Sequence, residues 1–541
     1  MDEDRDECLN LKECPLIPWY FLAGEDCKPM NFNNSTTDKT ERLKDKDILA
    51  YQWDSMNWNK VYQQVNRLQT RIAKAAANGK MNEVKRLQYL LTHSFYAKVY
   101  AVRKVTTNKG KKTAGVDNVL WTTSAIKMNA AITLTDKGYK SKPLKRVFIA
   151  KKGKNKKRPL GIPTMYDRAM QTLYALALEP VAETNGDKIS FGFRKGRSAK
   201  DACEQIFNVL ARKVSPTWIL EGDIKGCFDN INHQWLQENI PTDKAVMKQF
   251  LKSGFVHDGE LFPTVMGTPQ GGAISSLYAN MTLDGLEKII QDKYHRNSKG
   301  IIENHYRAKT KVNLIRYADD FIITAATKET ADEIKVVIKE FLEVRGLELS
   351  EEKTLITHID EGFDFLGWTF RKFKGKLLTK PSKKSVKSVT EKLSTVILKQ
   401  GKADTQDELI RRLNQIIRGW TNYHKHTVAS KAFSDINNNL YLLLQRWAKY
   451  RHPNKNTWWR INRYWHEHGF KRWMFKTEEN VLINLRTIPI IRHPKLRTTM
   501  NPFTDANYFS KRKRVIYSLN AARNGKEMLE PCERETLMHG S

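Results

Sequence analysis

The sequence predicts a multidomain protein of the α+β class, and three stretches carry that prediction. From Trp53 to Val105, apolar residues recur at spacings of three and four, which is typical of amphipathic helices. Between about residues 142 and 380, short apolar runs alternate with helical patterns and Gly/Pro turns, which indicates strands with helices between them. After Pro381 the pattern is again helical, with many basic and aromatic residues.

Length and composition favour a folded protein that does not cross a membrane. The chain has 541 residues, 40% hydrophobic and 10% aromatic, which suits hydrophobic cores in three or four domains. No apolar run approaches the ~18 residues needed to span a bilayer. The acidic start "MDEDRDECLN" is unlike a secretory signal or a transit peptide. We therefore expect a soluble protein of the bacterial cytoplasm or nucleoid, with an organelle as the alternative, and no membrane partner.

The net charge is the strongest global indication of a partner. The chain carries 93 Lys and Arg against 59 Asp and Glu, a formal net charge of +34. Such a chain repels itself unless it meets a polyanion, and the usual polyanion is nucleic acid. A highly charged surface without a partner is the alternative, but the basic residues are clustered, which favours nucleic-acid binding.

The cysteines indicate reduced thiols rather than a disulfide framework. No two of them form a CxxC pair, and a zinc site built from the first three has poor ligand spacing. The six cysteines are Cys8, Cys14, Cys27, Cys203, Cys227 and Cys532.

In chain order, residues 1–45 are polar and aperiodic and are expected to form an extension. The helical stretch that follows is divided into two helices by "ANGK" at residues 77–80. Residues 142–158 are rich in Lys and Arg and lack acids. The apolar "VFIA" precedes the basic run "KKGKNKK" and "LGIP" follows it, so we expect a hairpin with a basic turn. The turn is either a solvated tip or, because of its self-repulsion, a contact for phosphate.

The middle of the chain alternates helices with β-type runs. We expect a helix over residues 166–181 and another from about Ser198, with the turn "SFGFRKGRS" between them. A strand in "TWILEGDIKGCFDNI" and the Gly/Pro-rich loop "MGTPQGG" follow. The remaining expected elements are the hairpin "NLIRYADDFIITA", a helix over 331–345, and short strands in "KTLITHI" and "FDFLGWTF".

The region after Pro381 is expected to consist of amphipathic helices such as "ELIRRLNQIIRGWTNYHKH". Its closely spaced tryptophans are either core residues or platforms on which bases stack, since aromatics interleaved with Lys and Arg suit both roles. These tryptophans are Trp447, Trp458, Trp459, Trp465 and Trp473.

Three aspartates form the constellation that indicates chemistry. Asp223 and the pair Asp319–Asp320 stand where apolar β-type runs meet turns, and bringing them together would cost energy unless cations bind between them. Carboxylates select hard ions such as Mg²⁺, and two ions about 4 Å apart clamp a phosphoryl transfer. A polar turn is the alternative for the pair, although a two-residue hairpin favours Asn-Gly or Asp-Gly, and Asp-Asp lacks that glycine.

An ordered set of motifs then resembles one protein family. "YADD" after an apolar strand resembles the catalytic hairpin of reverse transcriptases, "DIKGCFDNI" their first carboxylate motif, and "GTPQGG" their nucleotide loop. "GIPTMYDRAMQ", "GFRKGRSAKDA", "SEEKT" and "FDFLGW" occur in the expected order. From roughly Trp53 to Arg514 the chain resembles the group II intron-encoded proteins, the maturase–reverse transcriptases.

The resemblance implies a right-hand polymerase, with fingers and palm around an antiparallel sheet, then an α-helical thumb or maturase domain and a basic DNA-binding tail. The implied divisions are an N-terminal extension (1–45), the helical extension of the reverse transcriptase (46–120), fingers and palm (121–380), thumb or maturase domain (381–480), and a basic DNA-binding segment (481–541).

The resemblance also implies roles at the reacting end of the site. Asp223, Asp319 and Asp320 would be the catalytic, metal-binding carboxylates, with the backbone carbonyl of Ile224 as a further ligand. Asp320 is expected to be the more supportive member of its pair. The implied cofactors are two Mg²⁺ ions, with Mn²⁺ as a substitute, and the substrates are deoxynucleoside triphosphates.

Five further residues are implied to bind the nucleotide. Lys151 and Arg158 would hold the triphosphate, and Gln270 would touch the incoming nucleotide, with Gly271 and Gly272 allowing close backbone approach. Phe228 would exclude ribonucleotides by its bulk, and its alternative is an ordinary core phenylalanine. Lys353 would donate a proton to pyrophosphate, and its alternative is a solvent-facing lysine.

Nucleic-acid contacts complete the implied site. The "FLGW" segment resembles a primer grip, although such an aromatic cluster could equally belong to a core; its residues are Phe365, Leu366, Gly367 and Trp368. The basic residues implied to bind RNA or DNA are Arg194, Lys195, Arg197, Arg418, Lys511, Arg512, Lys513 and Arg514.

One departure from the family concerns the end of the chain. Many relatives continue into an HNH endonuclease with paired Cys and His, whereas this sequence ends in "EPCERETLMHGS". We therefore expect no cleavage of the second DNA strand, and priming by another strand such as a nascent one at a host replication fork.

The function expected from these motifs is that of a group II intron-encoded reverse transcriptase and maturase. It would bind its intron RNA and flanking exon RNA, assist splicing, and copy the intron into target DNA by target-primed reverse transcription during retrotransposition. The alternatives are a reverse transcriptase recruited to CRISPR adaptation or phage defence, and a splicing-only maturase without polymerase activity. The absence of a fused partner argues against the first, and the intact aspartates argue against the second.

Overall fold

The computed structural model describes residues 39–150, 157–303, 308–468 and 471–521. Residues 1–38, Lys151 and the cysteines Cys8, Cys14, Cys27 and Cys532 lie outside the described residues, so the expectations for them are not addressed. In the described ranges, no helix is long and apolar enough to cross a membrane.

A helical bundle opens the described chain and packs against one long later helix. The predicted break at "ANGK" is confirmed, because one helix ends at Ala77 and the next begins at Met81, with Gly79 at φ 69° between them. The apolar stripe Val61, Val65, Leu68 and Ile72 of the first of these two helices is buried in the core that it shares with the long later helix. The helices are α1 (Lys39–Asp54), α2 (Trp58–Ala77), α3 (Met81–His93), α4 (Phe95–Thr107), η3 (Lys109–Lys112), α5 (Ser124–Thr133) and the long α6 (Met165–Asn185).

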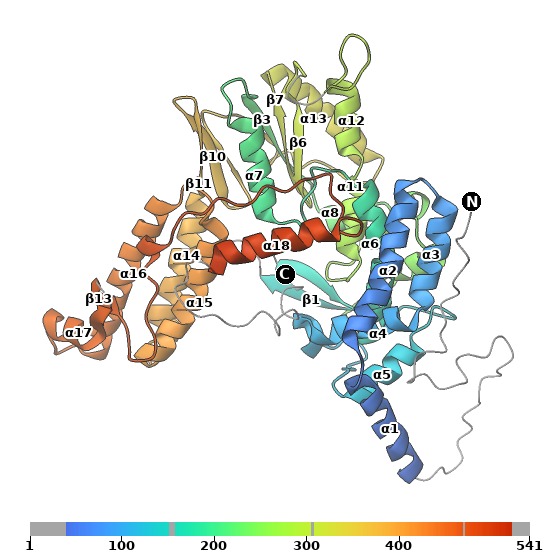
Figure 1. Ribbon diagram of the computed structural model, residues 1–541, viewed down its shortest axis with the longest axis horizontal. Helices are drawn as coiled ribbons and strands as arrows, with labels where there is room; N and C mark the ends of the chain where they lie inside the picture. The colour runs from blue at the N-terminus through green and yellow to red at the C-terminus, as the bar shows by residue number, and fades with distance from the viewer. Residues whose placement is uncertain (1–38, 151–156, 304–307, 469–470, 522–541) are drawn as a thin grey trace.

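An antiparallel sheet, called the central sheet below, lies between two layers of helices in the upper part of Figure 1. Its strand order is β6-β7-β3-β8, from β3 (Trp218–Asp223), β6 (Asn313–Tyr317), β7 (Asp320–Ala325) and β8 (Leu355–His358). Successive strand residues face opposite sides, so Leu220 and Ile219 enter different cores. Leu220 packs in the core that includes α13 (Lys328–Glu343), and Ile219 in the core that includes α7 (Ala199–Leu210).

A second sheet contains the predicted basic hairpin. Strands β1 (Leu144–Ala150) and β2 (Lys157–Ile162) pair antiparallel, which confirms the hairpin, although its turn at 151–156 is outside the described residues. The sheet is completed by β4 (Phe255–His257) and β5 (Glu260–Phe262). The short helices that occur between residues 227 and 294 are α8 (Cys227–Asn230), α9 (His233–Asn239), α10 (Lys244–Leu251), α11 (Ser275–Leu283) and α12 (Leu286–Tyr294).

A small sheet connects the central domain to a separate helical domain, which has its own core. Its strands, in the order β11-β10-β9, are β9 (Phe363–Phe365), β10 (Trp368–Phe373) and β11 (Lys376–Pro381). The helical domain, at the left of Figure 1, contains α14 (Lys383–Thr395), the π-helical η4 (Val396–Gln400), α15 (Gln406–His424), α16 (Ser430–Arg451) and α17 (Thr457–Tyr464).

Two details of the helical domain differ from the sequence expectation. It contains a hairpin, β12 (Trp465–His468) with β13 (Lys471–Phe475), in a region expected to be helical. Leu482 and Leu485, the latter in η5 (Leu485–Thr487), belong to its core, so the domain continues past the expected boundary at residue 480.

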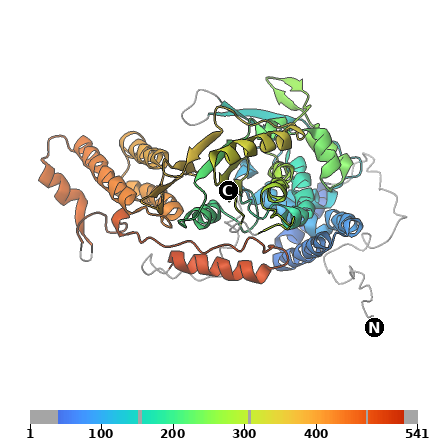
Figure 2. The same cartoon turned by 90° about the horizontal axis from the view of Figure 1, so that it is seen from above.

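The C-terminal segment returns from the helical domain to the first half of the chain. Figure 2 shows residues 488–505 running beneath the central sheet and leading into α18 (Ala506–Ala521). Thr70 Oγ1 donates a hydrogen bond of 2.9 Å to the Phe503 carbonyl, and Asn501 Nδ2 donates one of 3.0 Å to Thr184 Oγ1. The basic segment therefore packs on the molecule as a strap.

Candidate functional site

Strand pairing brings the three predicted carboxylates together. Asp223 is the last residue of β3, Asp320 is the first of β7, and the two are register partners across the antiparallel pair. Asp319 precedes Asp320 in the turn that joins β6 to β7. The expected association of these residues, which are distant in sequence, is thus present in the fold.

The turn of the hairpin differs from the interpretation based on the sequence. Tyr317 pairs with Asp320, so the two turn residues are Ala318 and Asp319, not the two aspartates. Ala318 has φ 57°, a left-handed conformation that costs a residue with a side chain about 1–3 kcal/mol. Asp320 is held in the regular strand, whereas Asp319 projects from the turn.

A neighbouring segment supports this strained turn. Ser190 forms a bridge to Arg316 of β6, which leads Gly192 up to the hairpin tip. A Cβ on Gly192 would lie 2.4 Å from the Ala318 nitrogen, so only glycine fits there. The glycine of "SFGF" therefore has a defined structural reason.

The carboxylates carry more negative charge than the surrounding protein compensates. Burial raises the pKa of Asp319, and Asp223 raises it further. Burial together with Asp319 and Asp223 raises the pKa of Asp320 to about 6. Mutual repulsion of this kind, in a set made only of carboxylate oxygens, fits a hard divalent cation.

The cation that contacts Asp223 in this structure is Lys353, whose Nζ forms an ion pair with Oδ2. The segment that carries Lys353 is bonded to the end of β3, because Ser350 N donates to the Asp223 carbonyl at 2.8 Å and Lys225 N donates to the Glu348 carbonyl at 2.9 Å. Across the part of the chain that is described, no group of three His, Cys, Asp or Glu has an arrangement ready to hold a metal ion. The predicted ligands are thus neighbours, but they are not set as a finished metal site.

Ile224 and Lys353 both lie next to Asp223, one in the backbone that follows it and the other through a side-chain ion pair. Ile224 is buried and bridges to Leu349, and the two hydrogen bonds of that bridge use the Asp223 carbonyl and the Lys225 amide. Neither of these two bonds involves the Ile224 carbonyl, and its role as a metal ligand stays a prediction. Lys353 is 54% exposed and also contacts the Asp223 carboxylate, and its role as a proton donor stays a prediction.

The "GTPQGG" loop is fixed between β2 and α8. Thr268 N donates to the Phe228 carbonyl at 2.6 Å, and Gly161 N donates to the Gln270 carbonyl at 2.7 Å. Gly271 has φ 113°, and a Cβ there would lie 2.7 Å from the Gly161 carbonyl oxygen. The glycine permits close approach of β2, which is a contact within the protein.

Gln270 lies in a chain of side chains that the sequence reasoning found only in part. Arg158 Nε donates to Gln270 Oε1 at 3.0 Å, and Gln270 Nε2 donates to both carboxylate oxygens of Asp229 at 2.9 and 3.0 Å. Asp229 was not predicted, although it stands in "DIKGCFDNI" directly after Phe228. Phe228 is half-buried, with an edge-on contact to Phe193 at 6.5 Å between ring centroids.

The predicted primer grip forms a tight turn whose flanking aromatics are core residues. Leu366 and Gly367 have φ 50° and 85° and join β9 to β10. Trp368 is fully buried and stacks on Tyr423 of α15 at 4.4 Å, and the Tyr423 hydroxyl donates to the Leu366 carbonyl at 2.8 Å. The core alternative therefore holds for Trp368 and the buried Phe365, while Leu366 and Gly367 form the turn.

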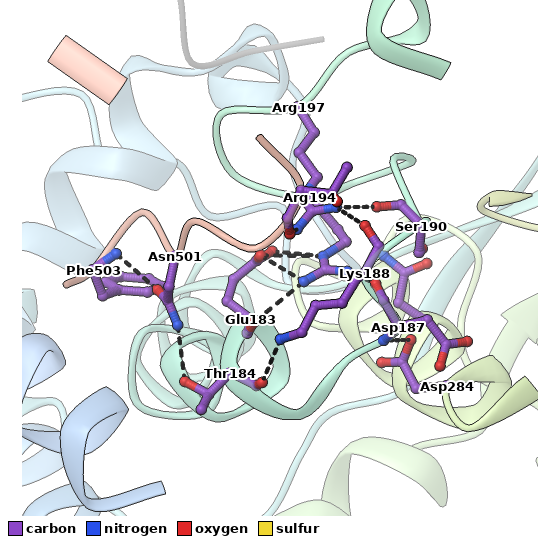
Figure 3. A network of polar contacts seen from close by, with 12 residues as sticks. Glu183, Thr184, Asp187, Lys188, Ser190, Arg194, Arg197, Asp284, Asn501 and Phe503 are labelled. Carbon is purple, nitrogen blue, oxygen red and sulfur yellow. Dashed lines mark hydrogen bonds and ion pairs between the residues drawn. The ribbon is translucent and has the colours of Figure 1, made fainter. Parts of the chain in front are cut away.

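The structure corrects the prediction that Arg194 binds nucleic acid. Its guanidinium is buried, donates to both carboxylate oxygens of Glu183 at 2.8–3.1 Å, and also donates to the Asp187 carbonyl (Figure 3). A guanidinium with these bonds has no free fork for phosphate. Arg194 holds the turn after α6 instead.

Two more of the predicted arginines are also engaged inside the protein. Arg197 donates to the carbonyls of Lys188 and Ser190 at 2.6 and 2.9 Å. Arg512 of α18 forms an ion pair with the buried Asp201 of α7. Both residues have structural contacts. Arg197 holds the turn at residues 188–190, and Arg512 joins α18 to α7.

The other predicted basic residues remain available to a ligand. Arg418, Lys511, Lys513 and Arg514 are exposed, and Lys195 is half-buried with its ammonium 4.6 Å from the centre of the Phe503 ring.

The tryptophans of the helical domain divide into two groups. Trp447 and Trp465 are core residues, at 1% and 4% exposure. Trp458 and Trp473 are 67% and 54% exposed, with ring centroids 6.5 Å apart, at the end of the domain formed by α17 and β13. The core alternative thus holds for Trp447 and Trp465, and base stacking on Trp458 and Trp473 stays a prediction.

Comparison with protein families matches three parts of the chain in the order of the fold. Residues 149–370 match the family described as reverse transcriptase (RNA-dependent DNA polymerase), and residues 53–134 match the N-terminal domain of reverse transcriptase. Residues 386–465 match the group II intron, maturase-specific domain. The chain therefore combines a reverse transcriptase domain with a group II intron maturase-specific domain.

Curated relatives agree with this assignment. Group II intron-encoded protein LtrA of Lactococcus lactis subsp. cremoris is 35% identical over 52% of this chain and 56% of its own length. Protein YkfC of Escherichia coli (strain K12) is 29% identical over 56% of this chain and 87% of its own. Maturase-like protein 1 of Euglena gracilis is 24% identical over 68% of this chain and 77% of its own. The match thus spans little more than half the length of the first of these relatives.

Proposed function

We propose that the protein is an RNA-directed DNA polymerase and maturase that binds a group II intron RNA, assists its splicing, and copies it into DNA at a target site during retrotransposition. The observation that carries the polymerase part is the meeting of Asp223, Asp319 and Asp320 at one strand end. It occurs beside a nucleotide loop that α8 and β2 hold in place.

The three aspartates would hold the divalent ions, for which Mg²⁺ is the intracellular choice. When bound, such ions supply positive charge that favours ionisation of a 3′-hydroxyl and neutralises a leaving pyrophosphate. Before they bind, Lys353 neutralises Asp223. When the Lys353 ammonium is displaced from Asp223 by metal ions, it would still lie close enough to the site to donate a proton to pyrophosphate.

The nucleotide would lie between the basic hairpin and α8. Arg158 is exposed at the start of the described part of β2, where a guanidinium can reach phosphate oxygens. Phe228 lies next to the loop that carries Gln270, as a residue that excludes ribonucleotides by bulk should. The Leu366–Gly367 turn would support the primer strand.

Binding of intron RNA, with target DNA and exon RNA as further partners, is supported by charge and exposed aromatic surface. The net charge is +34, and the segment that carries exposed Trp458 and Trp473 also carries the exposed basic residues Lys455 and Arg463. Base stacking on exposed aromatics contributes about 1–3 kcal/mol per base. The maturase-specific match to residues 386–465 favours this partner over a role in CRISPR adaptation or phage defence.

Primer extension on an RNA template tests the polymerase. The Asp319→Ala/Asp320→Ala variant is expected to lose cDNA synthesis by at least about a thousandfold, because the ion ligands are gone, while RNA binding and splicing of the intron persist. Asp332→Ala, which removes one exposed acid on α13, is the control for loss of surface charge and should leave synthesis unchanged. Retained synthesis in the double variant would refute the assignment.

A further inference from the structure

Asp229 occupies an unusual place for an acid. It is exposed on α8, one residue after Phe228, and both oxygens of its carboxylate accept a hydrogen bond from Gln270 Nε2. A carboxylate beside the site of a highly charged triphosphate repels that substrate. Its position therefore calls for a compensating role.

The contacts of Asp229 fix the orientation of the Gln270 amide. Because Nε2 faces Asp229, Oε1 must face the opposite way, where it accepts from Arg158 Nε at 3.0 Å. One side chain thus connects the acid of α8 to the arginine of β2. Removal of the acid leaves the amide free to rotate, and the arginine then loses its defined partner.

The backbone around the three hydrogen-bonded side chains Asp229, Gln270 and Arg158 is already fixed, so only their side-chain conformations can still change. The amides of Gly267 and Thr268 donate to the Ile231 and Phe228 carbonyls at 2.8 and 2.6 Å, and β2 is bonded to the Gln270 carbonyl. With its backbone held at both ends, the loop can change mainly through the rotamer of Gln270. Asp229 controls that rotamer directly.

A second basic residue faces the same acid. Arg146 of β1 lies over the Phe255 ring, with its guanidinium carbon 3.7 Å from the ring centre. Burial lowers the pKa of Arg146, and the charge of Asp229 opposes that lowering. The charge of Asp229 thus acts on Arg146 of β1 as well as on the side chains that link it to β2.

We propose that Asp229 is a positioning residue for the deoxynucleoside triphosphate: through Gln270 it holds Arg158 in the orientation that receives the phosphates. The inference rests on the proposed polymerase function and adds to it a residue that touches no substrate atom. Arg158 is the group that contacts phosphate, and Gln270 transmits the constraint.

Single-turnover incorporation of one nucleotide on an RNA template, with a DNA primer, measures the effect. Asp229→Ala is expected to weaken the apparent nucleotide affinity about tenfold, the size expected for loss of a charge-assisted hydrogen bond, with the maximal rate changed less than about threefold. Asp229→Asn retains an oxygen that accepts from Gln270 Nε2 and should recover most of the affinity. Asp332→Ala is the charge-matched control.

Coupling to Gln270 separates positioning from a general structural role. Asp229→Ala/Gln270→Ala should bind nucleotide no worse than Gln270→Ala alone, since both act through one chain. Additive losses, an unchanged affinity, or a tighter affinity caused by relief of repulsion would each overturn the inference. If Asp229→Ala does not fold, the Asn variant decides: near-normal affinity supports the hydrogen-bond role, and a full tenfold loss overturns it.

The wild-type reaction keeps the two proposals apart. An active wild-type enzyme with an indifferent Asp229 refutes the positioning role alone. A wild-type protein that incorporates no nucleotide on any primed RNA refutes the polymerase function, and the positioning role with it.

Discussion

Gly192 shows how one missing side chain determines the position of the aspartates. Its Cα faces the backbone of Ala318, the strained residue of the β6–β7 turn, at a distance that excludes a Cβ. Gly192 itself does not have a positive φ. The requirement for glycine is therefore one of space and not of backbone conformation.

Gly192→Ala is expected to push the hairpin tip away from Asp223. We expect cDNA synthesis to fall about a hundredfold, the cost of displacing a catalytic group by about 1 Å, and stability to fall by about 1–3 kcal/mol. Primer extension and thermal unfolding measure the two effects.

The matched control is Gly419→Ala in α15, where a Cβ meets nothing within 4 Å. It should keep full synthesis and gain about 0.5–1 kcal/mol of stability, because alanine favours the helix. Equal activity of the two variants would show that Gly192 does not position the hairpin.

At the scale of elements, the turn between α6 and α7 is stabilised by a buried ion pair. Arg194 and Glu183 are 8% and 6% exposed and are bonded through two guanidinium nitrogens. Breaking one partner of a buried pair leaves an uncompensated charge, which costs more than the pair contributes.

Arg194→Ala should therefore destabilise the protein by about 3–5 kcal/mol. Arg418→Ala, on the exposed face of α15, should leave the unfolding temperature unchanged and weaken RNA binding by about threefold to tenfold. Thermal unfolding and filter binding of RNA distinguish the two arginines, and equal behaviour would contradict the assignment of Arg194 to the core.

These arginines also show where sequence reasoning stops. Periodicity predicted the helical bundle and its break, and alternation predicted the basic hairpin and the strands that bear the aspartates, because both patterns depend on neighbours within a few residues. Whether Arg194 is buried depends on Glu183 and on how the turn packs, and the burial of Arg512 depends on Asp201, about three hundred residues earlier. No local pattern contains that information.

The same reasoning explains the remaining differences at this scale. Trp447 and Trp458 have similar basic neighbours in the sequence, yet one is in the core and the other is exposed. The β12–β13 hairpin lies where the sequence pattern predicts helices, because strands of four and five residues are too short to show a clear alternation. The Asp229–Gln270–Arg158 chain joins three segments that only the fold brings together.

At the scale of the whole molecule, the palm, the helical domain and the C-terminal segment meet at a junction rich in histidine. Burial, followed by Lys200, His493 and His424, lowers the pKa of His426 to about 3. Burial and Lys200 lower the pKa of His424 to about 4. The facing charged groups are Lys200 of α7, Lys425 at the end of α15, and His493 paired with Asp201.

This junction should make the protein sensitive to acid. A histidine with a lowered pKa in the folded state takes up its proton more readily when unfolded. The stability that it contributes is therefore present above pH 6.5 and is lost as the pH falls toward 4.

His426→Leu should reduce the fall in unfolding temperature between pH 7.5 and pH 5, since one of the two buried histidines no longer titrates. The measurement is thermal unfolding at both values, with His466→Leu, an exposed histidine of β12, as the control that should retain the wild-type slope. An unaltered slope in His426→Leu would assign the acid sensitivity to other groups.

The returning C-terminal strap also affects the order in which the protein can mature during synthesis. Asp201 is buried near the middle of the chain, but its partners His493 and Arg512 are made about three hundred residues later. Thr70 likewise can form its hydrogen bond to the Phe503 carbonyl only after Phe503 has been synthesised. Contacts with such separation close last, so a ribosome that stops early leaves a palm with an uncompensated acid. Folding of the central domain is therefore completed only after the segment up to Arg512 has been synthesised.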